Sequence, residues 1–287
     1  MFFSTKTVTS TSSLSERTAW LGEQLAQADC VLIGAGAGLT TAAGIDYAGD
    51  DFRREFGEWI VRYGFTDLYS AGFYPFETDE ERWAYWAKHI WFGRYRTGAL
   101  PLYRQLLQKV AAQDYFVITT NVDGQFEMAG FDPQRIFATQ GDYAFFQPAS
   151  GSPAELYYNR EWVERALPAI HDCRLPSELI PHTPEGQPVS MNLRCDDTFV
   201  EDARWHQQAR RYSDFVRAVS GRKLLLLEFG VGFNTPVIIR FPFEQMAAQF
   251  PDATLVRFNR DYPQLSTQGI PRFMAFTENV SRIVSAI

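Results

Sequence analysis

The chain has 287 residues, 46% hydrophobic and 15% aromatic, which is enough for one large globular unit with an insertion. Its 27 lysines and arginines against 34 aspartates and glutamates give a net charge of −7, which argues against a general nucleic-acid surface. No apolar run reaches the roughly 18 residues that a membrane span needs, so we expect neither nucleic acid nor membrane as a partner.

The N-terminal seventeen residues are rich in Ser and Thr and lack the apolar region of a secretory signal. We expect a ragged terminus here, with a short mitochondrial transit peptide as the alternative. The cysteines Cys30, Cys173 and Cys195 have no CxxC spacing, which argues against a disulfide framework and favours a reducing, cytoplasmic compartment.

Helical and strand patterns alternate along most of the chain. Residues 14–28 have helical spacing with Ser15 as the expected N-cap, and the buried strand DCVLIG follows and runs into glycines. A second helix and strand follow in LPLYRQLLQKVAAQ and DYFVITTN. Further strands are expected in RIFATQG, RKLLLLEFGVG and ATLVRFN. This order predicts an α/β fold, a Rossmann-like parallel sheet with helices on both faces and ligands at its carboxyl edge.

Two stretches break the alternation and predict a smaller inserted module. Residues 49–99 are aromatic and helical, and residues 146–220 combine a loop rich in Pro, Ser and Gly with a helix. The Rossmann-like part is then expected at 14–48, 100–145 and 221–287. Within the aromatic run, Trp83, Trp86 and Ile90 have helical spacing, which favours a core role over a face that covers a cofactor or a partner.

The glycine loop GAGAG, Gly34 to Gly38, places backbone N–H groups at the start of a helix, where pyrophosphate binds readily. The motif by itself is a weak signal, because a tight strand-to-helix turn without a ligand has the same sequence. A dehydrogenase fingerprint would need a third glycine at the position of Leu39.

Several motifs together resemble the sirtuins. They are GAGLTTAAGI (36–45), TTNVDGQFEMAG (119–130), TQG (139–141), FGVGFNTP (229–236) and FN (258–259), in sirtuin order and spacing. The stretches MNLRCDDTFVED (191–202) and GVGFNTPVIIRFPF (230–243) are similar to the macrodomain-linked class M sirtuins. The resemblance covers most of the chain and implies a single sirtuin-like catalytic unit over residues 1–287. Members of this class resemble protein ADP-ribosyltransferases more than deacylases.

The resemblance assigns a role to individual positions. Gly36, Ala37 and Gly38 match the phosphate-binding glycine motif, and Asn121 and Asp123 match the pair that lines the nicotinamide side of the pocket. The whole NAD site implied in this way consists of Gly36, Ala37, Gly38, Thr40, Ile45, Asn121, Asp123, Gln140, Gly230, Gly232 and Asn259.

Gln140 occupies the position of the sirtuin histidine. In a deacylase that histidine deprotonates a ribose hydroxyl, and an uncharged amide cannot take up the proton. Cleavage of the nicotinamide bond needs no such base, because it passes through an oxocarbenium-like species. The expected catalytic residues are therefore Asn121, Asp123, Gln140 and Arg194 of a transferase.

Arg194 is expected from the class resemblance to steer a carboxylate acceptor or to hold the ribose. The competing interpretation is a surface ion pair with Asp196 or Asp197, which would be weak.

A zinc ribbon is usual in sirtuins, but the expected stretches of this chain have no CxxC pair. We therefore expect no metal. A substitute site built from His171, Cys173, His182 and Glu185 is the alternative.

The sequence thus predicts an enzyme that transfers ADP-ribose from NAD to a carrier protein and releases nicotinamide. The resemblance implies a lipoyl-carrier protein of the glycine-cleavage H type as acceptor and a macrodomain hydrolase as a further partner. The alternatives are an NAD-dependent deacylase with another base and a catalytically silent protein that binds NAD or ADP-ribose.

Overall fold

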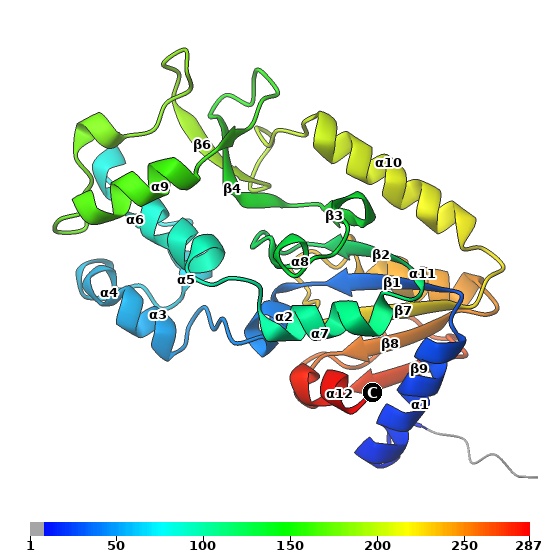
Figure 1. Ribbon diagram of the computed structural model, residues 1–287. Coiled ribbons are helices and arrows are strands. Elements are labelled where there is room, and N and C mark those ends of the chain that lie inside the picture. The colour runs from blue at the N-terminus through cyan, green and yellow to red at the C-terminus, as the bar shows by residue number, and fades with distance from the viewer. Residues whose placement is uncertain (1–8) are drawn as a thin grey trace, which may run out of the picture.

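The computed structural model describes residues 9–287 and has a six-stranded parallel sheet at its centre (Figure 1). The strand order is β3-β2-β1-β7-β8-β9. The strands are β1 (Cys30–Ala35), β2 (Asp114–Thr119), β3 (Ile136–Ala138), β7 (Leu224–Phe229), β8 (Thr254–Phe258) and β9 (Phe273–Phe276). The predicted Rossmann-like α/β fold is confirmed, and β9 is a strand that the sequence pattern does not predict.

Both faces of this sheet are covered by helices because its strands are apolar on both sides. Val31 and Ile33 belong to one core, and Cys30 and Leu32 belong to the other. The first core includes side chains from α1 (Leu14–Gln27), α7 (Pro101–Val110) and α12 (Val280–Ala286). The second includes α10 (Ala203–Ala218) and α11 (Arg240–Gln249). In the described part of the chain, no helix combines the length and the apolar character of a membrane span.

The first helix starts earlier than the sequence pattern predicts. Ser13, not Ser15, is the N-cap of α1, and it exchanges hydrogen bonds with Glu16 in a capping box. The expectation of a ragged or targeting segment falls partly on residues 1–8, which lie outside the described residues.

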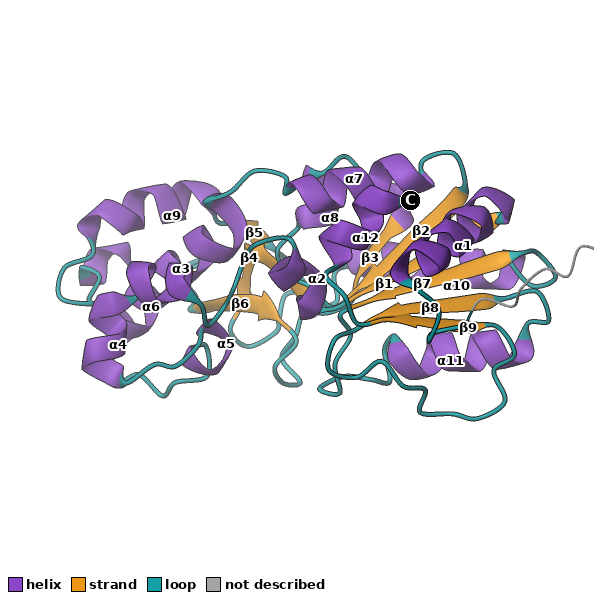
Figure 2. Cartoon of the chain, turned by 90° about the horizontal axis from the view of Figure 1, so that it is seen from below, coloured by secondary structure: helices purple, strands orange, loops and turns teal. Residues whose placement is uncertain are grey.

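A smaller module lies to one side of the sheet, beyond the end at which β1 runs into α2 (Ala37–Ala42) (Figure 2). It contains a three-stranded antiparallel sheet in the order β5-β4-β6. Its strands are β4 (Gly141–Pro148), β5 (Tyr157–Tyr158) and β6 (Val189–Leu193). Its α-helices are α3 (Asp50–Glu55), α4 (Gly57–Tyr63), α5 (Leu68–Ala71), α6 (Asp79–Ile90) and α9 (Arg160–Ala166). Shorter helical elements are the π-turn η1 (Trp91–Tyr95) and the 3-10 turns η3 (Leu167–Ala169) and η4 (Ser177–Leu179).

The core of this module is aromatic. Trp83 is 2% exposed and Ile90 is fully buried, so the aromatic run has the core role that its spacing favours. Helix α10 differs from the pattern-based boundaries, because it packs against β2 and β3 of the parallel sheet instead of the small module. The apolar side chains Tyr212 and Phe215 of α10 cover Phe116 of β2.

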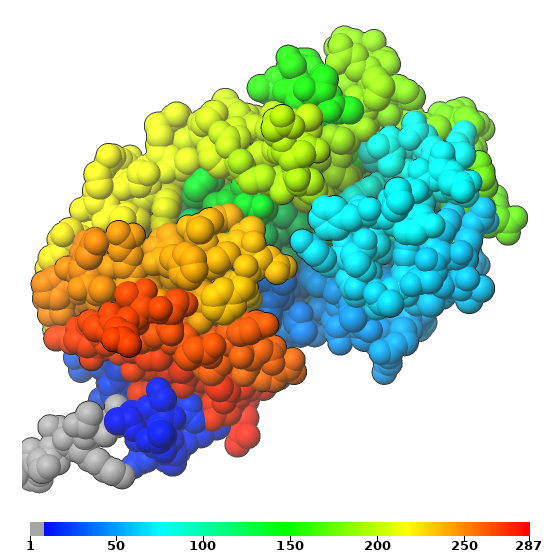
Figure 3. All heavy atoms as spheres, turned by 180° about the vertical axis from the view of Figure 1, so that it is seen from behind, coloured from blue at the N-terminus to red at the C-terminus, as the bar shows by residue number. Residues whose placement is uncertain are grey.

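The chain direction across the sheet reverses at β1. From β1 the chain continues outward through β2 and β3, and β7, β8 and β9 follow on the other side. Crevices at such a point, outside the carboxyl ends of the strands, are where open α/β sheets bind ligands. In Figure 3 the yellow-orange residues that follow β7 and the cyan residues of the small module stand on either side of a hollow.

Candidate functional site

The glycine loop after β1 and the glycine after β7 are in direct backbone contact. The N–H of Gly36 donates to Phe229 O at 2.9 Å, and the N–H of Gly38 donates to Gly230 O at 3.2 Å. A Cβ on Gly38 would lie 2.6 Å from the Cα of Gly230, whose φ is +58°. No side chain fits at either position, because these two loops meet where the strand order reverses.

These contacts reduce the number of backbone N–H groups that the glycine loop can offer to a pyrophosphate. The N–H groups of Gly36 and Gly38 are used within the chain. Ala37 and Gly38 are nevertheless exposed at the start of α2 and form its accessible surface.

A buried polar cluster lies directly beside this loop; its members are Thr40, Tyr103, Asn121 and Asp123. Asn121 Nδ2 donates to Gly36 O at 3.0 Å and to Thr40 Oγ1 at 3.2 Å. The Thr40 hydroxyl lies 2.9 Å from Tyr103 Oη and donates to Asp123 Oδ2 at 2.5 Å. The cluster therefore fixes the amide of Asn121 and the carboxyl of Asp123 relative to the glycine loop.

Asp123 is 1% exposed, and this burial raises the pKa of its carboxyl group. Hydrogen bonds from Thr40 and from the N–H of Gln125 oppose the change. Burial also raises the pKa of Tyr103 and of Tyr143, and the nearby Asp123 carboxylate adds to both. Burial thus acts in the same direction on all three groups, because it disfavours the charged form of the carboxyl and of both phenols.

Gln140 lies in the loop between β3 and β4 and is half-buried. Its backbone carbonyl oxygen accepts a hydrogen bond from the backbone N–H of Arg194 at 3.1 Å. Its side-chain amide makes one long contact, 3.5 Å from Nε2 to Thr139 Oγ1. The amide is thus held loosely by the chain and remains able to bind another group.

Arg194 lies next to Gln140, and its ion-pair partner is neither Asp196 nor Asp197. Its Nη2 contacts Glu201 Oε1 at 2.5 Å, and its guanidinium stacks on Phe199 and Trp205, 4.4 Å and 5.3 Å from the ring centroids. The guanidinium is therefore anchored on one side by a carboxylate and two rings.

The remaining residues of the predicted site lie at the same edge of the parallel sheet or close to it. Asn259, after β8, donates from Nδ2 to Val231 O at 2.9 Å and accepts from two backbone N–H groups of the loop that follows. Gly232 is exposed. Ile45 differs, because its side chain is 1% exposed in the core of the small module, and only its N–H reaches Thr40 O.

Known proteins of similar sequence identify the family of this chain. The chain is 30% identical over 261 residues to a "Protein ADP-ribosyltransferase" of Staphylococcus aureus (strain Mu50), covering 90% of this chain and 83% of that protein. The chain belongs to the sirtuin-type protein ADP-ribosyltransferases. It is also 31% identical over 234 residues to a "Probable bifunctional ADP-ribose hydrolase/ADP-ribosyltransferase" of Fusarium oxysporum f. sp. cubense, of which it spans 39%. No model of a protein family matches the chain.

Solved structures with a similar fold are sirtuins. Sir2Tm bound to a propionylated peptide has a TM-score of 0.56 at 15% identity, covering 94% of this chain and 96% of that one. A complex described as "Sir2-p53 peptide-NAD+" has a TM-score of 0.52 at 14% identity, covering 93% and 95%. At this identity the likeness shows a shared fold.

Ion pairs connect the segment around Arg174 to two helices of the small module. Among residues 9–287, no group of three or more His, Cys, Asp or Glu side chains is arranged for a metal ion. The alternative site is therefore not formed: Cys173 is buried, and His182 Nδ1 is 2.9 Å from Ile180 O. Instead, the buried Glu81 binds Arg62 at 3.0 Å and Arg174 at 3.3 Å.

Three residues that lie beside the predicted positions were not predicted from the sequence. Tyr103 lies in an ordinary amphipathic helix and gives no motif signal. Asp142 follows Gln140 within the TQGDY stretch, and Arg94 ends the aromatic run. Only the proximity of Asp142 to Gln140 in the sequence could have drawn attention to it.

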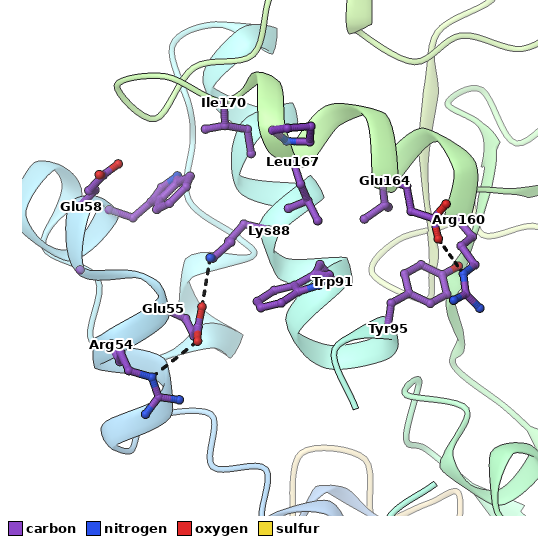
Figure 4. Close-up of a pocket in the computed structure, with 14 residues that line it drawn as sticks. Arg54, Glu55, Glu58, Lys88, Trp91, Tyr95, Arg160, Glu164, Leu167 and Ile170 are labelled. Carbon is purple, nitrogen blue, oxygen red and sulfur yellow. Dashed lines mark hydrogen bonds and ion pairs between the residues drawn. The ribbon is translucent and has the colours of Figure 1, made fainter. Parts of the chain in front are cut away.

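A cavity of about 1080 Å³ lies elsewhere, in the small module (Figure 4). Its walls come from α3 and α4, from α6 and η1, and from α9 and η3. Lys88 bridges to Glu55 there, 3.1 Å apart, above the Trp91 ring. None of the predicted site residues lines it, so its size does not indicate the site of the chemistry.

Proposed function

We propose that this protein cleaves NAD and transfers the ADP-ribosyl group to a protein acceptor, with release of nicotinamide. The observation that carries the proposal is the buried Thr40, Tyr103, Asn121 and Asp123 cluster at the point where the strand order reverses, with an amide at position 140 nearby. The sirtuin structures with the same fold include an NAD complex, which supports NAD as the donor.

In the proposed reaction, Asn121 and Asp123 bind the carboxamide end of NAD. The bond between the nicotinamide nitrogen and ribose C1′ breaks, and its electron pair leaves with nicotinamide. A nucleophilic group of the acceptor then forms a bond to C1′; a carboxylate does so without losing a proton, whereas a neutral nucleophile passes its proton to water. Gln140 holds a ribose hydroxyl by hydrogen bonds and takes up no proton at any step. Arg194 steers a carboxylate acceptor or holds the ribose.

The resemblance suggests a lipoyl-carrier protein of the glycine-cleavage H type as the acceptor. A macrodomain hydrolase, which would remove the ADP-ribosyl group, is the further proposed partner. The Fusarium relative supports a link of this kind, because its name joins an ADP-ribose hydrolase to an ADP-ribosyltransferase in one chain.

Incubation with labelled NAD and a lipoylated carrier, followed by intact-mass measurement, tests this function. We expect the carrier to gain one ADP-ribosyl group and free nicotinamide to appear in equal amount. Asn121→Ala is the inactive control, since it removes the amide that holds the reacting end of NAD. Release of O-acyl-ADP-ribose from an acyl-lysine peptide would favour a deacylase. Tight ADP-ribose binding without nicotinamide release would favour a silent binding protein.

A further inference from the structure

Arg94 lies where the small module meets the two loops that carry Asp123 and Gln140. It belongs to the π-turn η1, and Asp142 of β4 binds its guanidinium group. The distances are 2.9 Å from Nε to Oδ1 and 3.4 Å from Nη2 to Oδ2. The two side chains are 12% and 18% exposed. The pair is therefore a fixed, two-point contact, unlike a mobile surface ion pair.

The same guanidinium lies against Gly124, the residue after Asp123. A Cβ on Gly124 would lie 2.4 Å from Arg94 Cζ and 2.5 Å from Nη2, and Gly124 has a φ of +65°. A side chain at position 124 would push Arg94 away. The glycine of the NVDG motif is thus required by Arg94 as well as by its own backbone conformation.

Arg94 therefore connects two loops that are distant in the sequence. The loop 120–124 carries Asn121 and Asp123, and the segment 139–142, which leads into β4, carries Gln140. Backbone hydrogen bonds also join these segments, from Tyr143 N–H to Val122 O at 2.9 Å and, at their base, from Thr139 N–H to Thr119 O at 3.0 Å. None of these hydrogen bonds involves Gly124 or Asp142, and it is the planar guanidinium of Arg94 that spans these two residues.

We propose that Arg94, held by Asp142, is a positioning residue that sets Asp123 and Gln140 at the spacing the reaction needs. It acts through these loops and does not touch the reacting atoms. The inference rests on the proposed function, because it takes Asp123 and Gln140 to face the reacting end of NAD. A misplacement of about 1 Å is enough to slow a reaction by roughly 100-fold.

The test compares Arg94→Met, Arg94→Lys, Asp142→Asn and the double variant Arg94→Met/Asp142→Asn in steady-state nicotinamide release. For Arg94→Met we expect kcat to fall roughly 100-fold, while the dissociation constant for NAD changes by less than about threefold. The double variant should lose no more than Arg94→Met, since the residues act as one unit. Lysine should restore only part of kcat, because it keeps the charge but not the planar fork.

Arg17→Met is the matched control. Arg17 is 8% exposed and pairs with Glu278 through two nitrogens, in contact with Phe276 of β9, which is the outermost strand on the side of the sheet away from β2 and β3. Its loss should lower Tm and leave kcat of the folded enzyme unchanged. An Arg94→Met enzyme with kcat within twofold of the wild type, additive losses in the double variant, or full rescue by lysine would overturn the proposal.

Hydrogen exchange separates this proposal from the proposed function, because it needs no turnover. Peptides over residues 120–128 and 138–146 should exchange faster in Arg94→Met and Asp142→Asn than in the wild type, and should be unchanged in Arg17→Met. Unchanged exchange in both peptides of the Arg94 and Asp142 variants would contradict the positioning role. If the wild type releases no nicotinamide but its two peptides exchange more slowly than those of the Arg94 and Asp142 variants, only the proposed function is contradicted.

Discussion

Glu228 of β7 and Arg257 of β8 are paired residues of neighbouring strands and form a fully buried, two-point ion pair. Both contacts, Nε to Oε1 and Nη2 to Oε2, are 2.8 Å long. Arg257 also binds Glu244 at 2.8 Å and donates to Gln264 O at 2.6 Å. Together with Glu244, which accepts from the N–H groups of Ser266 and Thr267, the pair anchors the loop that follows Asn259.

Removing one partner of this pair should be strongly destabilising. Glu228→Ala leaves an arginine buried without its main counter-charge, and we expect it to lower the free energy of unfolding by about 3–5 kcal/mol. Asp214→Ala is the control, because its ion pair with Arg217 is exposed and should contribute less than about 1 kcal/mol. Urea unfolding followed by circular dichroism measures both. A Glu228→Ala loss no larger than the control would show that the pair is not needed for stability.

Asp123→Asn should stabilise the protein at neutral pH and abolish nicotinamide release. Burial raises the pKa of Asp123 in the folded chain, so its stabilising contribution is complete below about pH 4, where the unfolded carboxyl is also protonated. That contribution is lost as the pH rises through the folded-state pKa. An amide does not titrate, so the variant keeps its stability.

Thermal unfolding of the wild type and Asp123→Asn at pH 4 and pH 7 checks this sign. The Tm of the variant relative to the wild type should be higher at pH 7 than at pH 4. If the Tm difference between the variant and the wild type is no larger at pH 7 than at pH 4, ionisation of Asp123 does not destabilise the folded protein.

Chelators should not unfold the protein, because the turn at residues 171–174 is held by side chains. Treatment with EDTA should leave Tm unchanged, whereas Glu81→Gln should lower it by removing the buried charge that binds Arg62 and Arg174. Elemental analysis is the independent check. Stoichiometric zinc in the purified protein, or a Tm that falls in EDTA, would contradict this account of the turn.

Gln140→His should reduce transfer to the carrier, because an imidazole cannot make the same two-sided hydrogen bonds to a ribose hydroxyl as an amide. With an unperturbed pKa of about 6.5, the new histidine could also act as a base and allow some deacylation of an acyl-lysine peptide. Gln140→Ala is the matched control, since it removes the amide without adding a base. Transfer that is unaffected by both substitutions, or substantial deacylation by the unmodified protein, would show that Gln140 does not select the reaction.

The sequence by itself determined the fold class and most positions of the candidate site. Strand β1 is a continuous apolar run and β7 is apolar apart from Glu228, and a glycine follows each of them; such strands are typical of a parallel sheet covered on both faces. The carboxyl ends of such strands meet at one edge, so Gly36, Asn121 and Gly230 had to come together. The amide at position 140, where the sirtuin motif has a histidine, is likewise visible in the sequence.

The tertiary structure decided which side chains complete the site and which merely lie near it. Tyr103 and Arg94 reach Asn121 and Gly124 from helices whose sequences show only amphipathic or aromatic spacing, and no local pattern encodes a contact across the fold. The sequence suggests Asp196 or Asp197 as the ion-pair partner of Arg194, whereas the packing of the chain places Glu201 at 2.5 Å. Side-chain partners of this kind depend on how separate elements pack, and short-range sequence signals do not carry that information.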